Sequence, residues 1–320
     1  MALKALLPVF SVWDYKRMEK YLGIDLGGTN VKVAITDKTG NIYGSASVKT
    51  LACDDPEVPV RQIEAGVKAA LENAGLQMSD IKAAGFGIPG NGVWPKGEVI
   101  ICPNIGWNHF DAVGRLESIL GVPVFMGNDA DCMALAENSF GAGKNYRAFL
   151  MITLGTGVGG AFIMDGKPFV GAGPCAGEFG YIPLVHGGYE SNSGLNGCLE
   201  EYCSIRGMER LAMKEGFPEH TGPKRVFRML EEGKPAAERV VDAYTDLLAE
   251  GLTGLINIFR PEVILLGGGM ANAGAPLFDR LNEKIPRMTY ANDSVPAPKV
   301  TGTVLGTYAG ALGAAVLAME

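Results

Sequence analysis

The chain has 320 residues, a formal net charge of −7 and 20% charged residues, a composition typical of a soluble globular protein. This length is enough for two domains with cores that need no disulfide for stability. A nucleic-acid surface requires a basic stripe that displaces counterions, and the sequence contains no run of Lys or Arg. We therefore expect no nucleic-acid partner.

The remaining bulk properties point to a cytoplasmic protein. Six cysteines are spread over the chain, which favours reduced thiols over a disulfide framework. No apolar run approaches the roughly 20 residues that cross a bilayer, so we expect no membrane association. Residues 1–17 are an extension of uncertain status, whose short apolar stretch at 5–13 lacks a small-residue cleavage site. Met18 is an equally good start of translation.

The most informative segment is residues 21–30, an apolar run that passes through Asp25 to Gly27, Gly28 and Thr29. Its β-branched and aromatic residues predict a buried strand. Two glycines at the end of a strand let backbone N–H groups approach an anion closely. Asp25 is then placed to orient a phosphate or a metal-bound water.

Two further strands are predicted at 31–37 and 42–48, joined by a turn at Gly40-Asn41. Three successive antiparallel strands with a glycine turn between the first two resemble the opening of the actin-like ATPase (ribonuclease H-like) fold. That resemblance implies an α/β protein with two domains around a cleft.

Patterns of apolar residues predict the remaining elements in chain order. Strands are expected at 81–88, 122–126, 149–154, 161–164 and 263–266. Helices are expected at 59–74, which Gly75 ends, and at 116–120, 131–140, 199–215, 223–231, 236–259 and 306–319, and the composition of residues 185–197 predicts a loop.

The pattern of strand, glycine turn and strand occurs again at 149–164. A fold built from two such halves predicts this recurrence. We expect a smaller domain of residues 18–127, completed by the C-terminal helix at 306–320, and a larger domain of residues 128–305.

Three glycine-rich turns follow strands, and together they favour a bound nucleotide with Mg²⁺, because only glycine lets the main chain approach phosphates from several sides. Singly each turn is equally well explained as a tight connection. The second continues into a strand and not a helix, so it is not a dinucleotide fingerprint. The candidate ATP-binding residues are Asp25, Gly27, Gly28, Thr29, Gly155, Thr156, Gly157, Gly267, Gly268 and Gly269.

Asp129 is the candidate catalytic residue, at the junction of a strand and a helix. Phosphoryl transfer to a hydroxyl needs one carboxylate that accepts the proton of the attacking oxygen. Asn128 beside it can bond a second hydroxyl. By local sequence alone, the more common role for Asp129 is to cap the following helix, a role for which Asp131 competes.

Seven motifs in order resemble the ROK family of repressors, open reading frames and sugar kinases, from about residue 20 to the end. They are Asp25-Leu-Gly-Gly-Thr29, Gly87-Ile-Pro-Gly90, Pro103-Asn104-Ile105 with Trp107, Asn128-Asp129-Ala130, Leu154-Gly-Thr-Gly-Val-Gly-Gly160, Gly177-Glu-Phe-Gly180 and Gly194-Leu-Asn-Gly-Cys-Leu-Glu200.

The resemblance implies that Asp129 is the base acting on the 6-hydroxyl of a sugar. It also implies that four residues hold the other hydroxyls, namely Asn104, Asn128, Glu178 and Glu200. Converging polar side chains suit a sugar, whose hydroxyls must regain the hydrogen bonds they made to water.

The chain departs from the family at its zinc motif, which normally supplies one His and three Cys. Here the His position is Tyr181, the first two Cys positions are Ser191 and Ser193, and Cys198 alone remains. One ligand of four cannot build a tetrahedral site, so we expect no zinc, even with His186 nearby. The family histidine also touches the sugar, and Tyr181 is the candidate replacement.

The leading hypothesis is an ATP-dependent kinase that phosphorylates the 6-hydroxyl of glucose or a close relative. Allose, mannose, fructose and N-acetylmannosamine are alternative substrates, and polyphosphate is an alternative donor. A sugar-responsive repressor needs a helix-turn-helix module, and about 20 residues before the first strand are too few for one. A non-catalytic sugar sensor is disfavoured by Asp129 and the glycine turns. The resemblance suggests a homodimer.

Overall fold

The computed structural model describes residues 18–51, 55–95, 97–173 and 175–319. The extension at 1–17, with its apolar stretch, and Cys53 lie outside the described residues. Within the described ranges no helix has the length and apolar character needed to cross a membrane.

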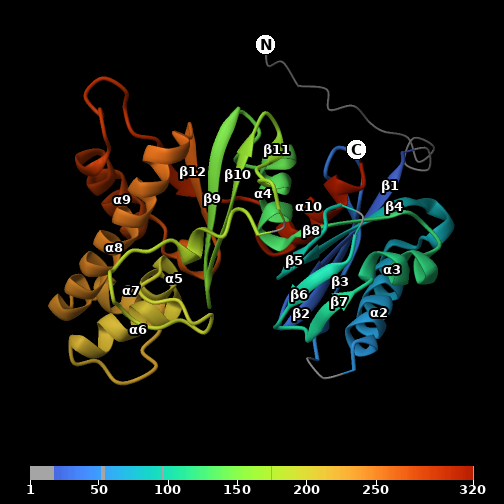
Figure 1. Ribbon diagram of the computed structural model, residues 1–320, viewed down its shortest axis with the longest axis horizontal. Helices are drawn as coiled ribbons and strands as arrows, with labels where there is room; N and C mark the ends of the chain where they lie inside the picture. The colour runs from blue at the N-terminus through green and yellow to red at the C-terminus, as the bar shows by residue number, and fades with distance from the viewer. Residues whose placement is uncertain (1–17, 52–54, 96, 174, 320) are drawn as a thin grey trace, which may run out of the picture.

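The first half of the chain is built on a five-stranded sheet in the order β3-β2-β1-β4-β8 (Figure 1). Its strands are β1 (Lys20–Leu26), β2 (Asn30–Thr36), β3 (Ile42–Lys49), β4 (Ile81–Ile88) and β8 (Val124–Asn128). The pairs β1–β2 and β2–β3 are antiparallel, as predicted, and β4 runs parallel to both β1 and β8.

Two amphipathic helices flank this sheet. The helix α2 (Glu57–Ala74) packs against β2 and β3, and α3 (Ala112–Leu120) packs against β8. Gly75 ends α2 in the left-handed region at φ 63°, as predicted, because glycine has no Cβ to oppose it. The short helix η1 (Met78–Asp80) leads into β4.

The second half repeats this plan with a sheet in the order β11-β10-β9-β12-β13. Its strands are β9 (Ala148–Leu154), β10 (Val158–Met164), β11 (Lys167–Pro168), β12 (Val263–Gly267) and β13 (Lys299–Gly302). The surrounding helices are η2 (Phe179–Tyr181), α5 (Leu199–Cys203), α6 (Ile205–Lys214), α7 (Pro223–Glu231), α8 (Pro235–Phe259), η3 (Gly269–Ala273) and α9 (Ala275–Met288).

Two helices lie between the sheets, α4 (Asp129–Phe140) and α10 (Ala309–Leu317), the latter preceded by η4 (Gly306–Tyr308) (Figure 1). The helix α10 rests so closely on β1 and β4 that a Cβ at Gly23 would lie 1.7 Å from the Ala311 carbonyl oxygen, and one at Gly85 would lie 1.6 Å from that of Ala314. The C-terminal helix is therefore packed on the first sheet.

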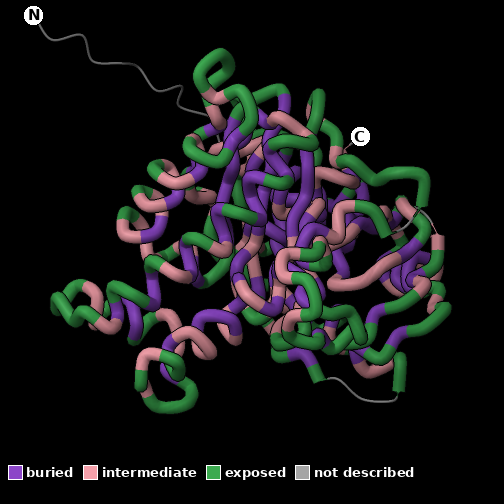
Figure 2. The backbone as a smooth tube through the Cα atoms, turned by 60° about the vertical axis from the view of Figure 1, so that its left-hand side comes forward, coloured by how far each residue is buried: buried purple, intermediate pink, exposed green. Residues whose placement is uncertain are grey.

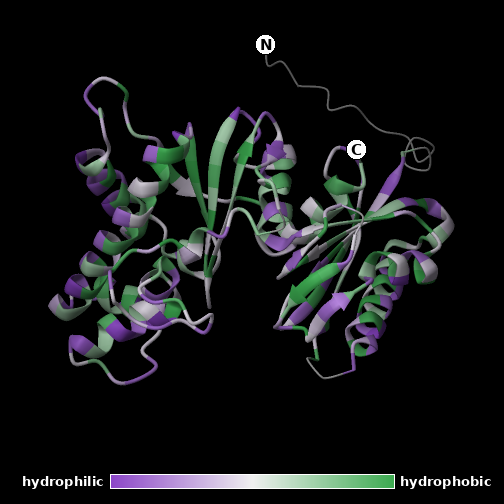
Figure 3. Ribbon diagram, in the orientation of Figure 1, coloured by the Kyte–Doolittle hydropathy of each residue, from purple (hydrophilic) through white to green (hydrophobic). Residues whose placement is uncertain are grey.

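Burial follows the sheets and the helix faces turned toward them (Figure 2). The strands β9 and β12 carry continuous apolar runs, and the outer helices carry both apolar and polar residues (Figure 3). Each sheet anchors a core of its own: one contains Leu22, Phe86 and Trp107, and the other contains Leu150 and Tyr244.

Several sequence predictions need correction. The predicted helix at 199–215 is two helices, because Ser204 is extended and its side chain caps α6 through Gly207 N. The helix predicted from 131 begins at Asp129, the short helix at 116–120 extends back to Ala112, and the final helix starts with a 3₁₀ turn.

Other elements were not predicted at all. They are β5 (Asn91–Gly92), β6 (Val99–Cys102) and β7 (Trp107–Phe110), which form a separate three-stranded sheet, and also β11, β13, α9 and the short helices η1 to η3. Strands of two to four residues are too short to show a period of two.

Candidate active site

Asp129 is the first residue of α4, and its neighbour Asn128 is the cap of that helix. The Asn128 Oδ1 accepts hydrogen bonds from Ala130 N at 2.8 Å and Asp131 N at 3.4 Å, while its Nδ2 donates to the Gly90 carbonyl at 3.3 Å. The interpretation of Asp129 or Asp131 as the cap is therefore wrong. Asn128 satisfies the helix start, and the Asp129 carboxylate accepts from Ala130 N at 2.9 Å.

Burial raises the pKa of Asp129 to about 7, helped by the negative charges of Asp25 and Glu178. Burial likewise raises the pKa of Asp131 to about 7, with Asp129 and Glu178 adding to the effect. Four carboxylates, one from β1, two from α4 and one from the residue before η2, thus form one electrostatic group. A carboxyl whose pKa lies near neutral pH is suited to general base catalysis.

Asp25 is the neighbour of Asp129 from the first sheet. Its carboxylate is buried, which raises its pKa, and its nearest cation is Lys32, with Nζ 3.9 Å from Oδ2. The turn that follows is tight, with Gly27 N donating to Asn30 O at 3.0 Å. The same turn reaches another predicted residue, since a Cβ at Gly28 would lie 3.8 Å from Asn104 Cβ.

The second glycine turn is bound to Glu200. The Glu200 Oε2 accepts from Val158 N at 3.0 Å, and a Cβ at Gly157 would lie 2.4 Å from the same oxygen. A side chain at position 157 would therefore have to displace the Glu200 carboxylate from Val158 N. Glu200, which is predicted to bind the sugar, therefore contacts the turn that is predicted to bind phosphate.

The third glycine turn lies beside the second, because β12 and β9 are parallel neighbours with Gly267 opposite Thr153. Gly268 has φ 82°, and a Cβ there would lie 2.3 Å from the Leu154 carbonyl oxygen. The second and third glycine turns therefore follow adjacent strands and lie at the same edge of the second sheet. That edge is where open α/β sheets bind ligands.

A cavity of about 770 Å³ opens beside this third turn. One wall is η3, with Gly269, Met270 and Asn272, and the other is α7, with Phe227. The cations of α7 that line it are Lys224, Arg225 and Arg228. The sequence analysis missed these α7 residues, because nothing in the local pattern of α7 signals a cavity formed with residues 40 positions away.

Glu178 and Tyr181 lie at the start and end of the short turn η2. The Glu178 Oε1 accepts from the Asn91 amide at 3.3 Å, and burial together with the Glu200 charge raises the pKa of Glu178. Tyr181 is 38% exposed, and burial, Glu200 and Glu178 raise the pKa of its phenol. Glu178, Tyr181 and Glu200, which are predicted to hold the sugar, thus lie close enough for the two carboxylates to act on each other or on the phenol.

The former zinc motif is a compact polar loop. Ser191 Oγ and Ser193 Oγ are hydrogen-bonded at 2.6 Å, Cys198 is buried, and His186 is exposed. Among the residues that the structure describes, no three His, Cys, Asp or Glu side chains are grouped as ligands of one metal ion.

The arrangement of two similar sheets with α4 and α10 between them is the actin-like ATPase fold. The solved ROK hexokinase from Thermus thermophilus is 34% identical and superimposes with a TM-score of 0.80 over 93% of this chain and 97% of that chain. The ROK family glucokinase from Streptomyces griseus in complex with glucose and AMPPNP is 30% identical, with a TM-score of 0.80 over 93% and 98%.

The chain belongs to the ROK family, whose profile matches residues 21–320. The glucokinase of Streptomyces coelicolor is 32% identical over 93% of this chain and 97% of its own length. The family predicted from the seven motifs is confirmed.

Proposed function

We propose that the protein is an ATP-dependent hexose kinase that transfers the γ-phosphoryl group of ATP to the 6-hydroxyl of glucose or a related hexose. The observation that carries the proposal is the buried Asp129 carboxyl, which lies at the start of α4 beside Asp25 and Glu178 and has a pKa of about 7. Membership of a family with glucokinases of similar length supports it.

In the proposed reaction Asp129 accepts the proton of the 6-hydroxyl as that oxygen attacks the phosphorus. The hydrogen bonds of Asn128 to the helix start fix the position of Asp129, which matters because positioning supplies most of the catalysis in phosphoryl transfer. Asn104, Asn128, Glu178, Tyr181 and Glu200 would hold the sugar.

The nucleotide would lie along the second sheet edge. Thr156 and Gly157 offer backbone N–H groups, as do Gly28 and Thr29 from the first half, while Gly155 N and Gly27 N donate to carbonyls within their own turns and shape them. The cavity between η3 and α7 has a volume suited to a base and ribose, and Gly267 to Gly269 lead into it. A cation such as Arg225 can stack on a purine ring.

The carboxylate chemistry fits Mg²⁺, which proteins bind through one or two carboxylates together with substrate phosphates. Asp25 is buried with its nearest cation 3.9 Å away, and such a carboxylate gains from a divalent cation. Bound Mg²⁺ would neutralise charge on the transferred phosphoryl group.

We also propose the division of the chain into residues 18–127 with 306–320, and residues 128–305. The close packing of α10 on Gly23 and Gly85 supports assigning the C-terminal helix to the first domain. A cytoplasmic location and a homodimer are proposed from the family resemblance. Closure of two domains on the ligands would exclude water, a competing phosphoryl acceptor.

The test is a coupled ADP-release assay with Mg·ATP and a panel of glucose, mannose, allose, fructose and N-acetylmannosamine. We expect sugar-dependent turnover with one preferred hexose, and replacement of ATP by polyphosphate tests the donor. A chain that binds a hexose by thermal shift but releases no ADP with any of them would contradict the kinase.

A further inference from the structure

One hydrogen bond joins side chains of the two halves in the candidate site. Asn91 lies in β5, part of the small sheet attached to the first half, and its Nδ2 donates to Oε1 of Glu178 at 3.3 Å. Glu178 immediately precedes η2, which packs on β10 and α5 of the second half. The partners are 87 residues apart in sequence.

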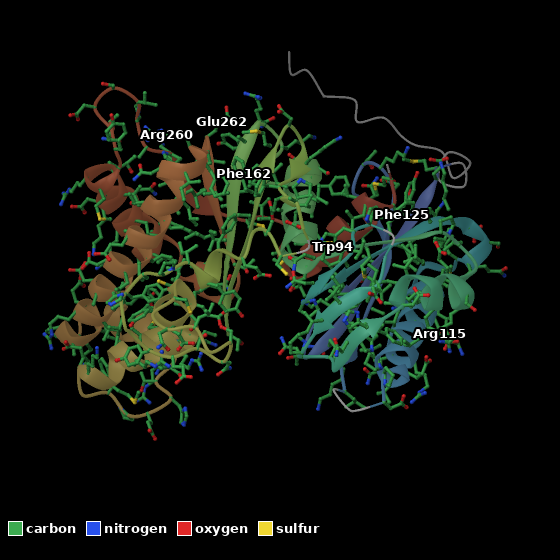
Figure 4. All side chains as sticks on the ribbon, in the orientation of Figure 1. Trp94, Arg115, Phe125, Phe162, Arg260 and Glu262 are labelled. Atoms are coloured by element: carbon green, nitrogen blue, oxygen red, sulfur yellow. The ribbon has the colours of Figure 1, made fainter. Side chains whose placement is uncertain are left out.

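The segment that carries Asn91 is fixed on both sides. The preceding carbonyl, Gly90 O, accepts from Asn128 Nδ2 at 3.3 Å. After it, Pro95 O accepts from Met126 N at 2.8 Å, and a Cβ at Gly92 would lie 3.0 Å from both Met126 Cε and the Trp94 ring. Figure 4 shows Trp94 on the side of the first half that faces the second.

We propose that Asn91 is a positioning residue for the sugar: its amide holds Glu178 Oε1 and orients the carboxylate, so that Glu178 Oε2 is presented to a sugar hydroxyl. The inference rests on the proposed function for the identity of the ligand. It adds a residue that neither the seven motifs nor the predicted site contains.

The surroundings of Glu178 explain why a donor is needed there. The charge of Glu200, in α5, raises the pKa of Glu178. The charge of Glu178 in turn raises the pKa of three acidic groups, those of Asp129, Asp131 and Tyr181. Burial and Glu200 favour its protonated form, and the Asn91 amide opposes them. A protonated Glu178 would be a poorer acceptor for a sugar hydroxyl, because bonds to a charged acceptor are the stronger ones.

The amide also restricts geometry. With Oε1 held by Asn91, rotation of the carboxylate is restricted, and Oε2 keeps both of its acceptor sites. The same turn orients Asn128 through Gly90. One short segment of the first half therefore fixes two predicted sugar residues, one at the start of α4 and one in the second half.

The experiment compares wild-type protein with Asn91→Leu, which keeps the size but removes the donor, and with Asn91→Asp. Asn108→Leu is the matched control, because Asn108 is exposed and pairs with the same strand residue, Ile101, from the opposite side. Glucose affinity is measured by calorimetry without nucleotide, and kcat and KM by ADP release.

We expect Asn91→Leu to weaken glucose binding and raise KM by about tenfold, with kcat changed less than about threefold, which is the scale of one hydrogen bond to a charged group. Asn91→Asp should bind glucose worst at alkaline pH and recover as pH falls, because one protonated carboxyl can donate to the other. Asn108→Leu should match the wild type.

A second measurement is independent of the sugar. The side-chain carboxyl carbon of Glu178, assigned by its loss in Glu178→Gln, is titrated by NMR in the ligand-free protein. Asn91→Leu should move its midpoint to higher pH by about one pH unit.

The outcomes separate the two proposals. An unmoved Glu178 midpoint with glucose affinity within twofold of wild type, in folded Asn91→Leu and Asn91→Asp, overturns the role of Asn91. A fall in kcat with unchanged KM also overturns it. A wild-type protein that binds no hexose, while the midpoint still moves in Asn91→Leu, overturns the hexose kinase and leaves the control of Glu178 by Asn91 standing.

Discussion

The Asp129 carboxyl is held at the first position of α4 by the cap that Asn128 provides, and burial raises its pKa to about 7. At the residue scale, this makes the proposed base sensitive to pH in the neutral range. The group accepts a proton only in its ionised form, so activity needs pH above that pKa.

We therefore predict an acid limb in the pH dependence of kcat/KM for glucose, with a midpoint near pH 7. Below it, kcat/KM should fall about tenfold per pH unit, because the ionised fraction of Asp129 falls tenfold. Initial rates between pH 5.5 and 8.5, with the coupling enzymes in excess, measure it. A profile that stays flat down to pH 5 would contradict the assignment.

The role of Asp129 as the base was predicted from the resemblance and stays a prediction. Its position at the start of α4 and its burial are known only from the structure. Local sequence offered two aspartates as caps, and the cap is Asn128. Asn91 and the α7 cations could not be predicted, because their importance comes from contacts between distant segments.

At the element scale, glycines decide how closely helix α10 approaches the first sheet. Gly85 faces the Ala314 carbonyl, whereas Gly254, in the exposed part of α8, has nothing within 4 Å of an added Cβ. The two positions form a matched pair for the same substitution.

Gly85→Ala should destabilise the protein by roughly 3 kcal/mol, the upper end of the range usual for overpacking, because the added Cβ meets backbone. Gly254→Ala should be neutral or stabilising by up to about 1 kcal/mol, since alanine favours helix. Urea unfolding measures both. Equal midpoints for the two variants would show that α10 does not pack on β4 as described.

The loop at 183–198 is held by aromatic and cationic side chains. The Tyr189 ring lies 5.4 Å from that of Tyr202 and 4.4 Å from the Arg210 guanidinium, and Tyr189 N donates to the Tyr202 hydroxyl at 3.1 Å. Ser191 and Ser193 bond each other at the former zinc positions. These contacts tie the loop to α5 and α6.

We predict that treatment with a chelator leaves the melting temperature within about 1 °C of its original value, and that activity returns fully with Mg²⁺ alone. A structural zinc ion contributes directly to folding, so its removal would lower the melting temperature. Metal analysis should find less than one zinc per chain. One zinc per chain would contradict the prediction and direct attention to His186 and Cys198.

Apart from the edge strands β11 and β13, the strands of the two large sheets were predictable, because buried strands carry apolar runs bounded by glycine. The strand at 81–88 has the predicted bounds. The helix α9 was missed although Leu277, Leu281 and Ile285 recur every four residues, a signal interrupted by Pro286. The break between α5 and α6 at Ser204 could not be predicted, because the local sequence does not distinguish a serine that caps a helix from a serine inside one.

At the scale of the whole molecule, the two halves are joined through α4 and the segment before α10. The buried Glu137 near the end of α4 accepts from Ala142 N at 2.8 Å, Val304 N at 2.9 Å and Leu305 N at 3.0 Å. Three backbone groups from two segments thus converge on one carboxylate. The two-fold repetition of strand, glycine turn and strand was predictable, while this connection was not.

In the proposed mechanism one carboxylate, that of Asp129, lies between the halves and accepts the proton of the sugar hydroxyl. Asp129→Asn removes it with almost no change in shape. The folded state should be at least as stable at pH 7, because a carboxyl whose pKa is raised by burial opposes folding when it is ionised. Asp279→Asn, at an exposed position in α9, is the matched control.

The most direct measurement is the rate of ADP release with glucose and Mg·ATP for wild type, Asp129→Asn and Asp279→Asn, with glucose binding followed by calorimetry in each. We predict that kcat falls at least about a thousandfold in Asp129→Asn alone, with glucose affinity within about tenfold of wild type. Turnover close to wild type in folded Asp129→Asn would contradict the proposed mechanism.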